Sequence, residues 1–178
     1  RVERVGRHAS PGAHLHVDHL DELSSIESLA RELDRVVPVT LRLNLNTGYS
    51  EPWSRFGFNL ESGEAHEAAR RIELNPQLRL TGLHSHIGTF ILEPRAYAEQ
   101  MRLMCEFMAW LEQDGQLRIE SLDIGGGLPS QNALQGVYLP PAQSVPEPEV
   151  FARAIVDALH QGVEYRVRLN QPLPRLIF

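Results

Sequence analysis

Two short segments carry residues that could form a binding site for a phosphorylated ligand. Each segment, Gly82–Thr89 and Ser121–Pro129, begins as a short apolar strand and ends in glycine and small polar residues. In a barrel of alternating strands and helices, functional residues lie at such carboxyl ends of strands. Three consecutive glycines, Gly125, Gly126 and Gly127, leave backbone N–H groups open to the close approach of an anion such as phosphate. A tight turn that binds nothing is the alternative.

Two histidines precede the first of these loops. His84 and His86 are two residues apart on an expected strand, so both side chains project from one face. One imidazole could lie against the ring of an aromatic cofactor while the other packs below it. The pair could instead bind a divalent metal or be buried with both nitrogens satisfied. Thr89 follows with a hydroxyl that can bond a phosphate oxygen, so the segments together predict a site for a phosphorylated aromatic cofactor.

A second histidine pair keeps metal binding open. His14 and His16 have the same spacing on another expected strand, and four histidines from two strands could form the metal site of a barrel hydrolase. Alternatively, this pair flanks a short strand that faces the surface. Asp123, just before the glycines, could point into the barrel or support a neighbouring histidine.

Arg42 lies in the middle of an otherwise apolar strand. A buried arginine needs a carboxylate or phosphate partner, so Arg42 either forms an ion pair with an acidic neighbour or belongs to the functional site. The remaining titratable side chains favour structural roles. His66 and His160 are expected on helices as solvated or capping residues, and Arg70–Arg71 as a solvated face. Cys105 lies among apolar residues and is expected to pack within a helix.

The order of apolar and amphipathic segments predicts an α/β fold. The expected strands are 14–17, 38–45, 78–87, 119–124 and 175–178, and the expected helices are 22–36, 62–74, 94–114 and 149–160. This alternation favours parallel βαβ units, with loops at 46–58 and 128–148. A closed eight-stranded barrel needs about 250 residues, so about five parallel strands predict a partial (β/α)8 barrel. An open Rossmann-like sheet is the alternative, although three glycines in a row match GxGxxG poorly.

Composition excludes several classes of protein. The chain of 178 residues is 42% hydrophobic and 22% charged, which is typical of a globular domain. A net charge of -6 argues against nucleic-acid binding, which depends on clustered cations. No apolar run is long enough to cross a membrane, no secretory leader opens the chain, and there is one cysteine, so we expect a cytoplasmic location. All 17 basic residues are arginines, and lysine is absent.

Five segments in this order resemble the fold-type III pyridoxal-phosphate decarboxylases. They are HVDHLDEL (16–23), LRLN (41–44), SRFGF (54–58), GLHSHIGT (82–89) and LDIGGGLP (122–129). This family includes diaminopimelate, ornithine and arginine decarboxylases, and its barrel is similar to that of alanine racemase. Each motif is modest alone, but five in order with sensible spacing identify the chain as a member.

The resemblance implies a cofactor, pyridoxal 5'-phosphate, and roles for matching residues. His86 would lie against the pyridine ring, and Thr89 stands where the family has a phosphate-binding serine. The glycines, Gly127 foremost, would bind phosphate through backbone N–H groups, and Arg42 would belong to the polar network of the site. The implied reaction is the decarboxylation of a basic or diamino amino acid, with diaminopimelate favoured, by a lyase that is a homodimer at full length.

The chain also departs from the family pattern. The family's Schiff-base lysine lies on an early strand, so we expect that lysine upstream of Arg1. Its acidic residue opposite the pyridine nitrogen follows a strand similar to 174–178, and a C-terminal β-domain follows later. Residues 1–178 are therefore expected to form an incomplete barrel domain without decarboxylase activity of its own. Phe90 after Thr89 also departs from the pattern. A non-catalytic relative with a binding or regulatory role, and the metal-dependent hydrolase, remain as alternatives.

Overall fold

The chain forms one parallel sheet covered by helices. The structure is a computed structural model that describes residues 15–49, 55–113, 117–130 and 145–178. Its strands are β1 (Leu15–Val17), β2 (Val37–Asn44), β3 (Phe58–Asn59), β4 (Leu78–Ser85), β5 (Ser121–Asp123) and β6 (Arg175–Ile177). They are ordered β1-β2-β4-β5-β6, with β3 beside β2, and every pairing is parallel. The predicted parallel sheet is confirmed, and the carboxyl ends of its strands meet at one edge.

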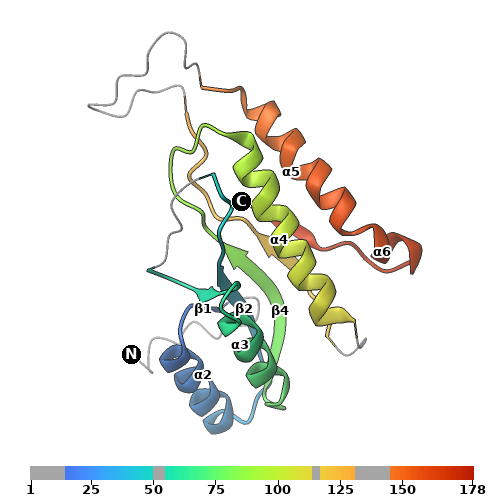
Figure 1. The fold of residues 1–178 in the computed structure, drawn as a ribbon. Helices are drawn as coiled ribbons and strands as arrows, with labels where there is room; N and C mark the ends of the chain where they lie inside the picture. Colours follow the sequence, from blue (N-terminus) through green and yellow to red (C-terminus); the bar gives the residue numbers. More distant parts are fainter. Residues whose placement is uncertain (1–14, 50–54, 114–116, 131–144) are drawn as a thin grey trace.

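Helices connect the strands. They are α2 (Leu20–Glu32), α3 (Glu64–Glu73), α4 (Pro94–Glu112), α5 (Pro148–Gly162) and the short α6 (Glu164–Arg168). The ribbon in Figure 1 shows α4 and α5 lying side by side, with α2 and α3 near the opposite end of the molecule. Four of the five helices were expected from the apolar periodicity of the sequence.

Side chains along the central strands alternate between two environments. Leu41, Leu43 and Leu83 are buried in the hydrophobic core. Arg42 lies between Leu41 and Leu43 on β2, and His84 follows Leu83 on β4. The two polar residues are paired in register. Because successive strand residues point to opposite faces, both polar side chains project away from that core. One face of the sheet therefore carries apolar side chains, and the other carries polar side chains.

The contact between α4 and α5 is close at a single glycine. A Cβ atom placed on Gly162 would lie 2.3 Å from the Cβ atom of Cys105, so no larger residue fits there without a shift of backbone. Cys105 is buried in the core, which confirms its predicted packing role, and burial raises the pKa of its thiol to about 12. At neutral pH this cysteine is a protonated core residue.

Helix α2 begins earlier than the sequence suggested. Its N-cap is His19, whose Nδ1 accepts a hydrogen bond from the Glu22 N–H at 3.1 Å. Ser24 and Ser25, which are residue types that often cap helices, instead donate to carbonyls four residues back, inside the helix. The expected start at Glu22 was therefore wrong by two residues, because a histidine ring took the capping role that favours serine.

Two predicted solvated groups make contacts in the structure. The His66 ring packs edge-on against Phe107 and Trp110, with ring centroids 4.9 and 4.4 Å away. Arg71 binds Glu27 of α2 through its Nε at 2.8 Å from Oε1. The prediction of solvation was wrong for these two side chains, since α2 and α4 both approach α3. His160 is exposed in the last turn of α5, as expected.

A buried ion pair joins α4 to α6. Arg166 is 1% exposed and forms a salt bridge with Glu112, whose side chain is 6% exposed. The guanidinium also donates to the carbonyls of Ile119 at 2.7 Å and Pro172 at 2.9 Å. Glu112 in turn accepts from the Tyr165 hydroxyl at 2.6 Å. Both charges are thus removed from water but fully hydrogen-bonded, which is the condition for tolerating them in a core.

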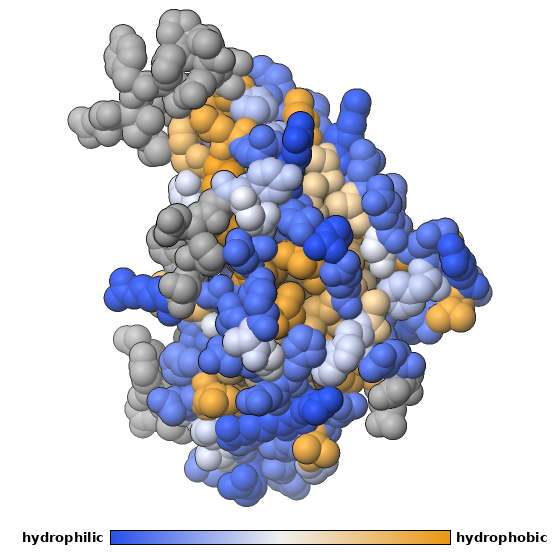
Figure 2. Space-filling model, in the orientation of Figure 1, coloured by the Kyte–Doolittle hydropathy of each residue, from blue (hydrophilic) through white to orange (hydrophobic). Residues whose placement is uncertain are grey.

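The surface is mixed in character. Figure 2 shows a face on which hydrophilic residues predominate and hydrophobic areas are small and separate. Within the described residues, no helix combines the length and the apolar character needed to cross a membrane.

Candidate functional site

The structure brings His86 and the three glycines together at the carboxyl edge of the sheet. A Cβ atom placed on Gly125 would lie 2.8 Å from Nδ1 of His86, and one on Gly127 would lie 3.2 Å from its Cε1. The ring also forms a hydrogen bond with the backbone of Gly126. Residues from β4 and β5 that are far apart in sequence therefore form one site, as the two motifs suggested.

In the glycine loop, Gly125 and Gly127 are closely packed, whereas Gly126 between them has open space around it. Gly125 and Gly127 have φ angles of 70° and 92°, a left-handed region that other residues rarely adopt. A Cβ atom on Gly127 would lie 2.6 Å from the Gly88 carbonyl oxygen. A Cβ atom on Gly126 would meet nothing within 4 Å, and Gly126 is exposed. The loop thus presents its middle residue to a ligand.

Two hydrogen bonds fix this loop and limit which donors a ligand can use. The Gly125 N–H donates to Oδ1 of Asp123 at 2.8 Å, so this donor is already occupied within the protein. The Gly127 carbonyl accepts from the Phe90 N–H at 2.8 Å, which ties the loop to the segment after β4. Three glycines were expected to bind phosphate through their N–H groups. Because the Gly125 N–H is occupied, Gly126 and Gly127 are the better candidates for this role.

A buried glutamine, which the sequence analysis missed, holds the two strand ends together. Gln100 of α4 is 0% exposed. Its Nε2 donates to the Ser85 carbonyl at 2.9 Å and to the Ile124 carbonyl at 3.1 Å. These residues come directly before His86 and Gly125, so one side chain fixes the spacing between ring and loop. A polar residue on the otherwise apolar face of a helix was the signal that could have identified it.

Replacing Gln100 with leucine is expected to lower the free energy of unfolding by about 1–3 kcal/mol, because two buried carbonyls lose this donor. Urea unfolding of the purified chain measures the change. Gln161→Leu, at an exposed position of α5, is the matched control and should have little effect. Equal losses for the two variants would mean that the two hydrogen bonds do not stabilise the strand ends.

Below His86, the inward side of the sheet carries a cluster of two histidines and a carboxylate. His16 Nε2 lies 3.9 Å from Asp123 Oδ2, and the rings of His16 and His84 are 4.8 Å apart between centroids. Asp123 therefore points inward beside a histidine, as one of its predicted orientations required. Burial lowers the pKa of His84 to about 4; nearby Asp123 opposes this shift. His84 is therefore neutral at pH 7.

The pKa of His84 predicts that the fold weakens in mild acid. Burial lowers this pKa from 6.5 to about 4, so between these values the unfolded chain binds a proton that the folded chain does not. The free energy of unfolding should therefore fall as pH decreases from 6.5 towards 4. Urea unfolding at several pH values, compared between the native chain and His84→Gln, measures this; the variant should show the flatter profile. Parallel profiles would contradict the assignment.

Arg42 reaches the same site without the predicted ion pair. Among the described residues no carboxylate lies within ion-pair distance of it, and its guanidinium lies 4.9 Å from the ring centroid of Phe56. The ion-pair alternative for Arg42 therefore has no support within the described residues. Burial first and the Arg42 cation second lower the pKa of His86, which keeps that imidazole neutral. An arginine beside the glycine loop leaves a positive charge available to an anion.

Other predicted residues lie at the edge of the site or beyond it. Thr89 is exposed, and its Cα would lie 3.1 Å from a Cβ atom on Gly127, so its backbone is next to the loop. His14 and Ser54 lie outside the described residues. One group of side chains that could hold a metal ion contains His16, His84 and Asp123 but not His86, so the four-histidine arrangement is not what the described part of the chain shows.

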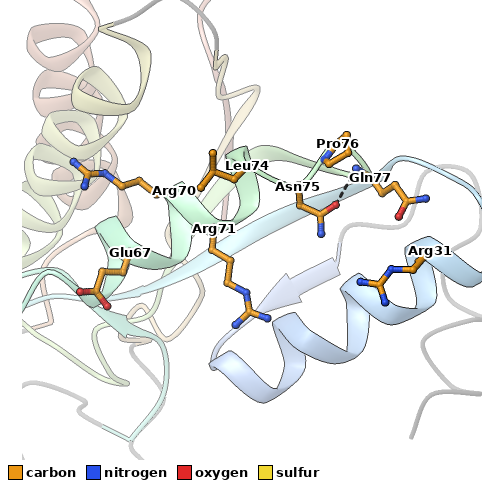
Figure 3. A pocket seen from close by; sticks show the side chains of 8 residues that line it. All are labelled: Arg31, Glu67, Arg70, Arg71, Leu74, Asn75, Pro76 and Gln77. Atoms are coloured by element: carbon orange, nitrogen blue, oxygen red, sulfur yellow. Dashed lines mark hydrogen bonds between the residues drawn. The ribbon is translucent and has the colours of Figure 1, made fainter.

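A groove with a volume of about 660 Å³ lies elsewhere. Figure 3 shows its lining residues, which come from α2, α3 and the turn before β4: Arg31, Glu67, Arg70, Arg71, Leu74, Asn75, Pro76 and Gln77. Gln77 precedes the first residue of β4, so this groove is at the amino end of the strands. The glycine loop and His86 are at the carboxyl end, where chemistry is expected in such folds.

The site's own geometry fits a phosphorylated aromatic cofactor. Gly126 offers open space for an anion beside backbone donors, Arg42 supplies positive charge, and His86 supplies a neutral ring next to both. A flat imidazole next to an anion-binding loop can support an aromatic ring that carries a phosphate.

Comparisons with known proteins agree with this fit. Residues 3–164 match the family model described as pyridoxal-dependent decarboxylase, pyridoxal binding domain. Diaminopimelate decarboxylase of Haemophilus influenzae is 26% identical over 160 residues, which cover 86% of this chain and 36% of that protein. Diaminopimelate decarboxylase of Actinosynnema pretiosum is 36% identical over 116 residues, which cover 62% of this chain and 26% of that protein.

Solved structures give the same fold. Diaminopimelate decarboxylase of Methanocaldococcus jannaschii superposes with a TM-score of 0.73 and 25% identity, over 93% of this chain and 37% of that one. A biosynthetic arginine decarboxylase of Campylobacter jejuni gives a TM-score of 0.75 and 21% identity, over 99% of this chain and 29% of that one. The chain thus spans about a third of the length of these relatives, and the predicted partial barrel is confirmed.

The family model covers most of the chain, and its description names pyridoxal, the cofactor that the resemblance of the five ordered segments implied. The chain therefore belongs to the pyridoxal-dependent decarboxylases, and its residues 3–164 match the pyridoxal-binding domain of that family.

Proposed function

We propose that the full-length protein is a pyridoxal 5'-phosphate-dependent decarboxylase of a basic or diamino amino acid, with diaminopimelate as the favoured substrate. The observation that carries this proposal is the contact between the His86 ring and a glycine loop whose central residue is open to a ligand. The sequence relatives compared above are diaminopimelate decarboxylases, which supports the substrate.

Each residue of the site would have a positioning task. His86 would lie against the pyridine ring and fix its plane, so that the bond to be broken stands perpendicular to it. Gly126 and Gly127 would bind the phosphate through their N–H groups, with the Thr89 hydroxyl beside them. Arg42 would add positive charge near the phosphate. When bound, pyridoxal phosphate supplies an electron sink for the negative charge left on the amino acid after carbon dioxide departs.

Asp123 would support the phosphate site from behind. Its carboxylate accepts the Gly125 N–H and so orients the loop that precedes Gly126. Gln100 would hold the same loop at a fixed distance from His86 through its two hydrogen bonds. These two residues do not touch the cofactor in this proposal, and they act by keeping the loop and the ring in place.

Binding by this chain alone would be non-covalent, because the sequence contains no lysine amine to react with the cofactor aldehyde. This makes pyridoxamine 5'-phosphate a suitable probe, since it has the ring and the phosphate but no aldehyde that could react with other amines. Pyridoxamine without the phosphate is its matched control. Any difference in affinity between the two probes then measures the contribution of the phosphate site.

The decisive variant is Gly126→Ala. An alanine Cβ meets no atom of the protein within 4 Å, so the fold should be unaffected, but the methyl group would occupy the space proposed for phosphate. We expect the affinity for pyridoxamine 5'-phosphate to fall at least about tenfold, which corresponds to about 1.4 kcal/mol. Fluorescence titration measures the affinity, and thermal unfolding checks the fold. Equal affinity for both probes, or unchanged binding by Gly126→Ala, would contradict the phosphate site.

The whole protein's assembly and location follow from the same proposal. We propose a homodimer at full length, in the cytoplasm, that takes a small-molecule amino acid as substrate. Release of L-lysine from meso-diaminopimelate by the full-length protein, compared with release of amines from ornithine and arginine, tests the substrate. Light scattering of that protein tests the dimer.

A further inference from the structure

We propose that His16, His84 and Asp123 bind one divalent transition-metal ion, of which Zn²⁺ and Co²⁺ are representative, on the inward side of the sheet below the His86 loop. The three residues come from β1, β4 and β5. His84 is in register with Asp123, and His16 is in register with Thr40 of β2, which pairs with Gly82, two residues before His84 on the same face of β4. This site shares Asp123 with the support of the glycine loop, but it does not depend on the proposed decarboxylase function.

The spacing suits three ligands of a single ion. One donor atom from each residue lies within 4.8 Å of the other two. Ligand atoms on a tetrahedral ion lie about 3.3 Å apart, because metal–ligand bonds of about 2.1 Å meet at tetrahedral angles. His16 Nε2 and Asp123 Oδ2 are 3.9 Å apart, and because all three donor atoms lie within 4.8 Å of one another, side-chain rotations would have to shorten these separations by at most about 1.5 Å.

The two rings are also arranged as on a shared ion. Their centroids are 4.8 Å apart, and their planes are tilted by 48°. Two imidazoles that bind one zinc ion have centroids about 5 Å apart, given bonds of about 2.1 Å and an angle near the tetrahedral value. Stacked or edge-packed rings reach similar separations, so this distance supports the site together with the carboxylate.

The carboxylate of Asp123 is already oriented for this role. Its Oδ1 accepts the Gly125 N–H at 2.8 Å, while Oδ2 faces His16. A hydrogen bond to one oxygen that directs the other towards a metal is the usual outer-shell support of carboxylate ligands. Asp123 would then connect the metal site to the glycine loop through a single side chain.

His84 has an unexplained nitrogen. Its Nδ1 is buried and has no hydrogen-bond partner among the described residues. Buried polar atoms are nearly always satisfied, so such an atom indicates a role or a missing ligand.

The types of ligand determine which ions the site would prefer, and the nearby charges determine how tightly an ion would bind. Two imidazoles and one carboxylate suit Zn²⁺, Co²⁺ or Ni²⁺, whereas Mg²⁺ and Ca²⁺ prefer oxygen ligands only. Arg42 is in register with His84 and opposes any cation there. His86 faces the same side two residues further along the strand, at about 6.6 Å. Removing the Arg42 charge should therefore tighten metal binding.

Cobalt titration of the full 178-residue chain tests the site, because tetrahedral Co²⁺ gives a visible absorption band. We expect one equivalent to bind with such a band. His16→Asn, His84→Gln and Asp123→Asn should each weaken binding at least tenfold and remove the band, and Arg42→Gln should strengthen binding several-fold. His19→Asn is the matched control, since His19, Asp18 and Glu22 form a second group that could hold a metal ion and that shares no residue with the proposed site. It should leave the band unchanged.

His16→Asn keeps the test decisive if the buried variants do not fold, because the His16 side chain is 37% exposed and tolerates replacement. An unchanged band in folded His16→Asn, or loss of the band in His19→Asn, would overturn the proposal, as would the absence of any stoichiometric binding. Failure here would leave the phosphate site untouched, since Gly126→Ala and pyridoxamine 5'-phosphate test that site separately.

Discussion

Replacing Glu112 with alanine is expected to lower the free energy of unfolding by about 3–5 kcal/mol, because removing one partner of a buried ion pair leaves the other charge uncompensated. Arg166 is 1% exposed, so its guanidinium cannot turn to water. The change would also remove the acceptor for the Tyr165 hydroxyl and for the Ile119 N–H, which donates to Glu112 at 2.7 Å. Urea unfolding followed by circular dichroism measures the loss.

The matched control for Glu112 is Glu164→Ala. Glu164 pairs with Arg168 at 2.6 Å, but both side chains are exposed, at 63% and 72%. Exposed pairs one helical turn apart stabilise by well under about 1 kcal/mol, so this variant should be close to the native chain. Similar losses for the two variants would show that burial of the Glu112–Arg166 pair is not what makes it important.

Replacing Gly127 with alanine is expected to lower the free energy of unfolding by about 2–6 kcal/mol, from two additive causes. Its φ of 92° is strained for any residue with a Cβ atom, and such strain costs about 1–3 kcal/mol. The new Cβ would also lie 2.6 Å from the Gly88 carbonyl oxygen, and forcing an extra carbon into a packed place costs about 1–3 kcal/mol. Thermal and urea unfolding measure the effect.

Gly126→Ala is the control for this variant, since the two positions are adjacent but differ in surroundings. Gly126 has open space for a Cβ atom, so its replacement should change stability by less than about 0.5 kcal/mol. Together the variants separate the two roles of the loop. Gly127 would determine whether the loop forms, and Gly126 would determine whether the formed loop admits phosphate. Equal stability of both variants would contradict the close approach of Gly127 to Gly88.

The central part of the site could be predicted from the sequence because its signals are local. His84 and His86 alternate along one strand, and three glycines follow another. A parallel βαβ arrangement then places both loops at one edge of the sheet. The contact between His86 and the loop in the structure follows directly from that topology. The identity of the cofactor came from the resemblance of ordered motifs, not from these spacings alone.

Other parts of the site depended on pairings that no local pattern encodes. His16 joins His84 and Asp123 only because β1 pairs with β2 in a particular register. Arg42 lies against Phe56 and not against a carboxylate, and the sequence offers no rule that chooses between them. Gln100 of α4 donates hydrogen bonds to two backbone carbonyls, those of Ser85 at the end of β4 and of Ile124 directly after β5. Such contacts are fixed by tertiary packing.

The element boundaries show the same limit on a smaller scale. Strand β3 is two residues long and α6 is five, and both lie where no sustained apolar period exists. The Glu112–Arg166 pair joins residues on separate helices, so neither charge looks unusual within its own segment. Long periodic segments such as α4 were predicted to within two residues, because the burial of one helix face is repeated over several turns.

The position of Cys105 makes its thiol a reporter of the contact between α4 and α5. It is the only cysteine of the chain, it is covered by α5 at Gly162, and its raised pKa keeps the thiol unreactive. A thiol reagent added to the folded protein can therefore react only when α5 lifts from α4. The rate of labelling at low reagent concentration would report how often that separation occurs, without any engineered probe.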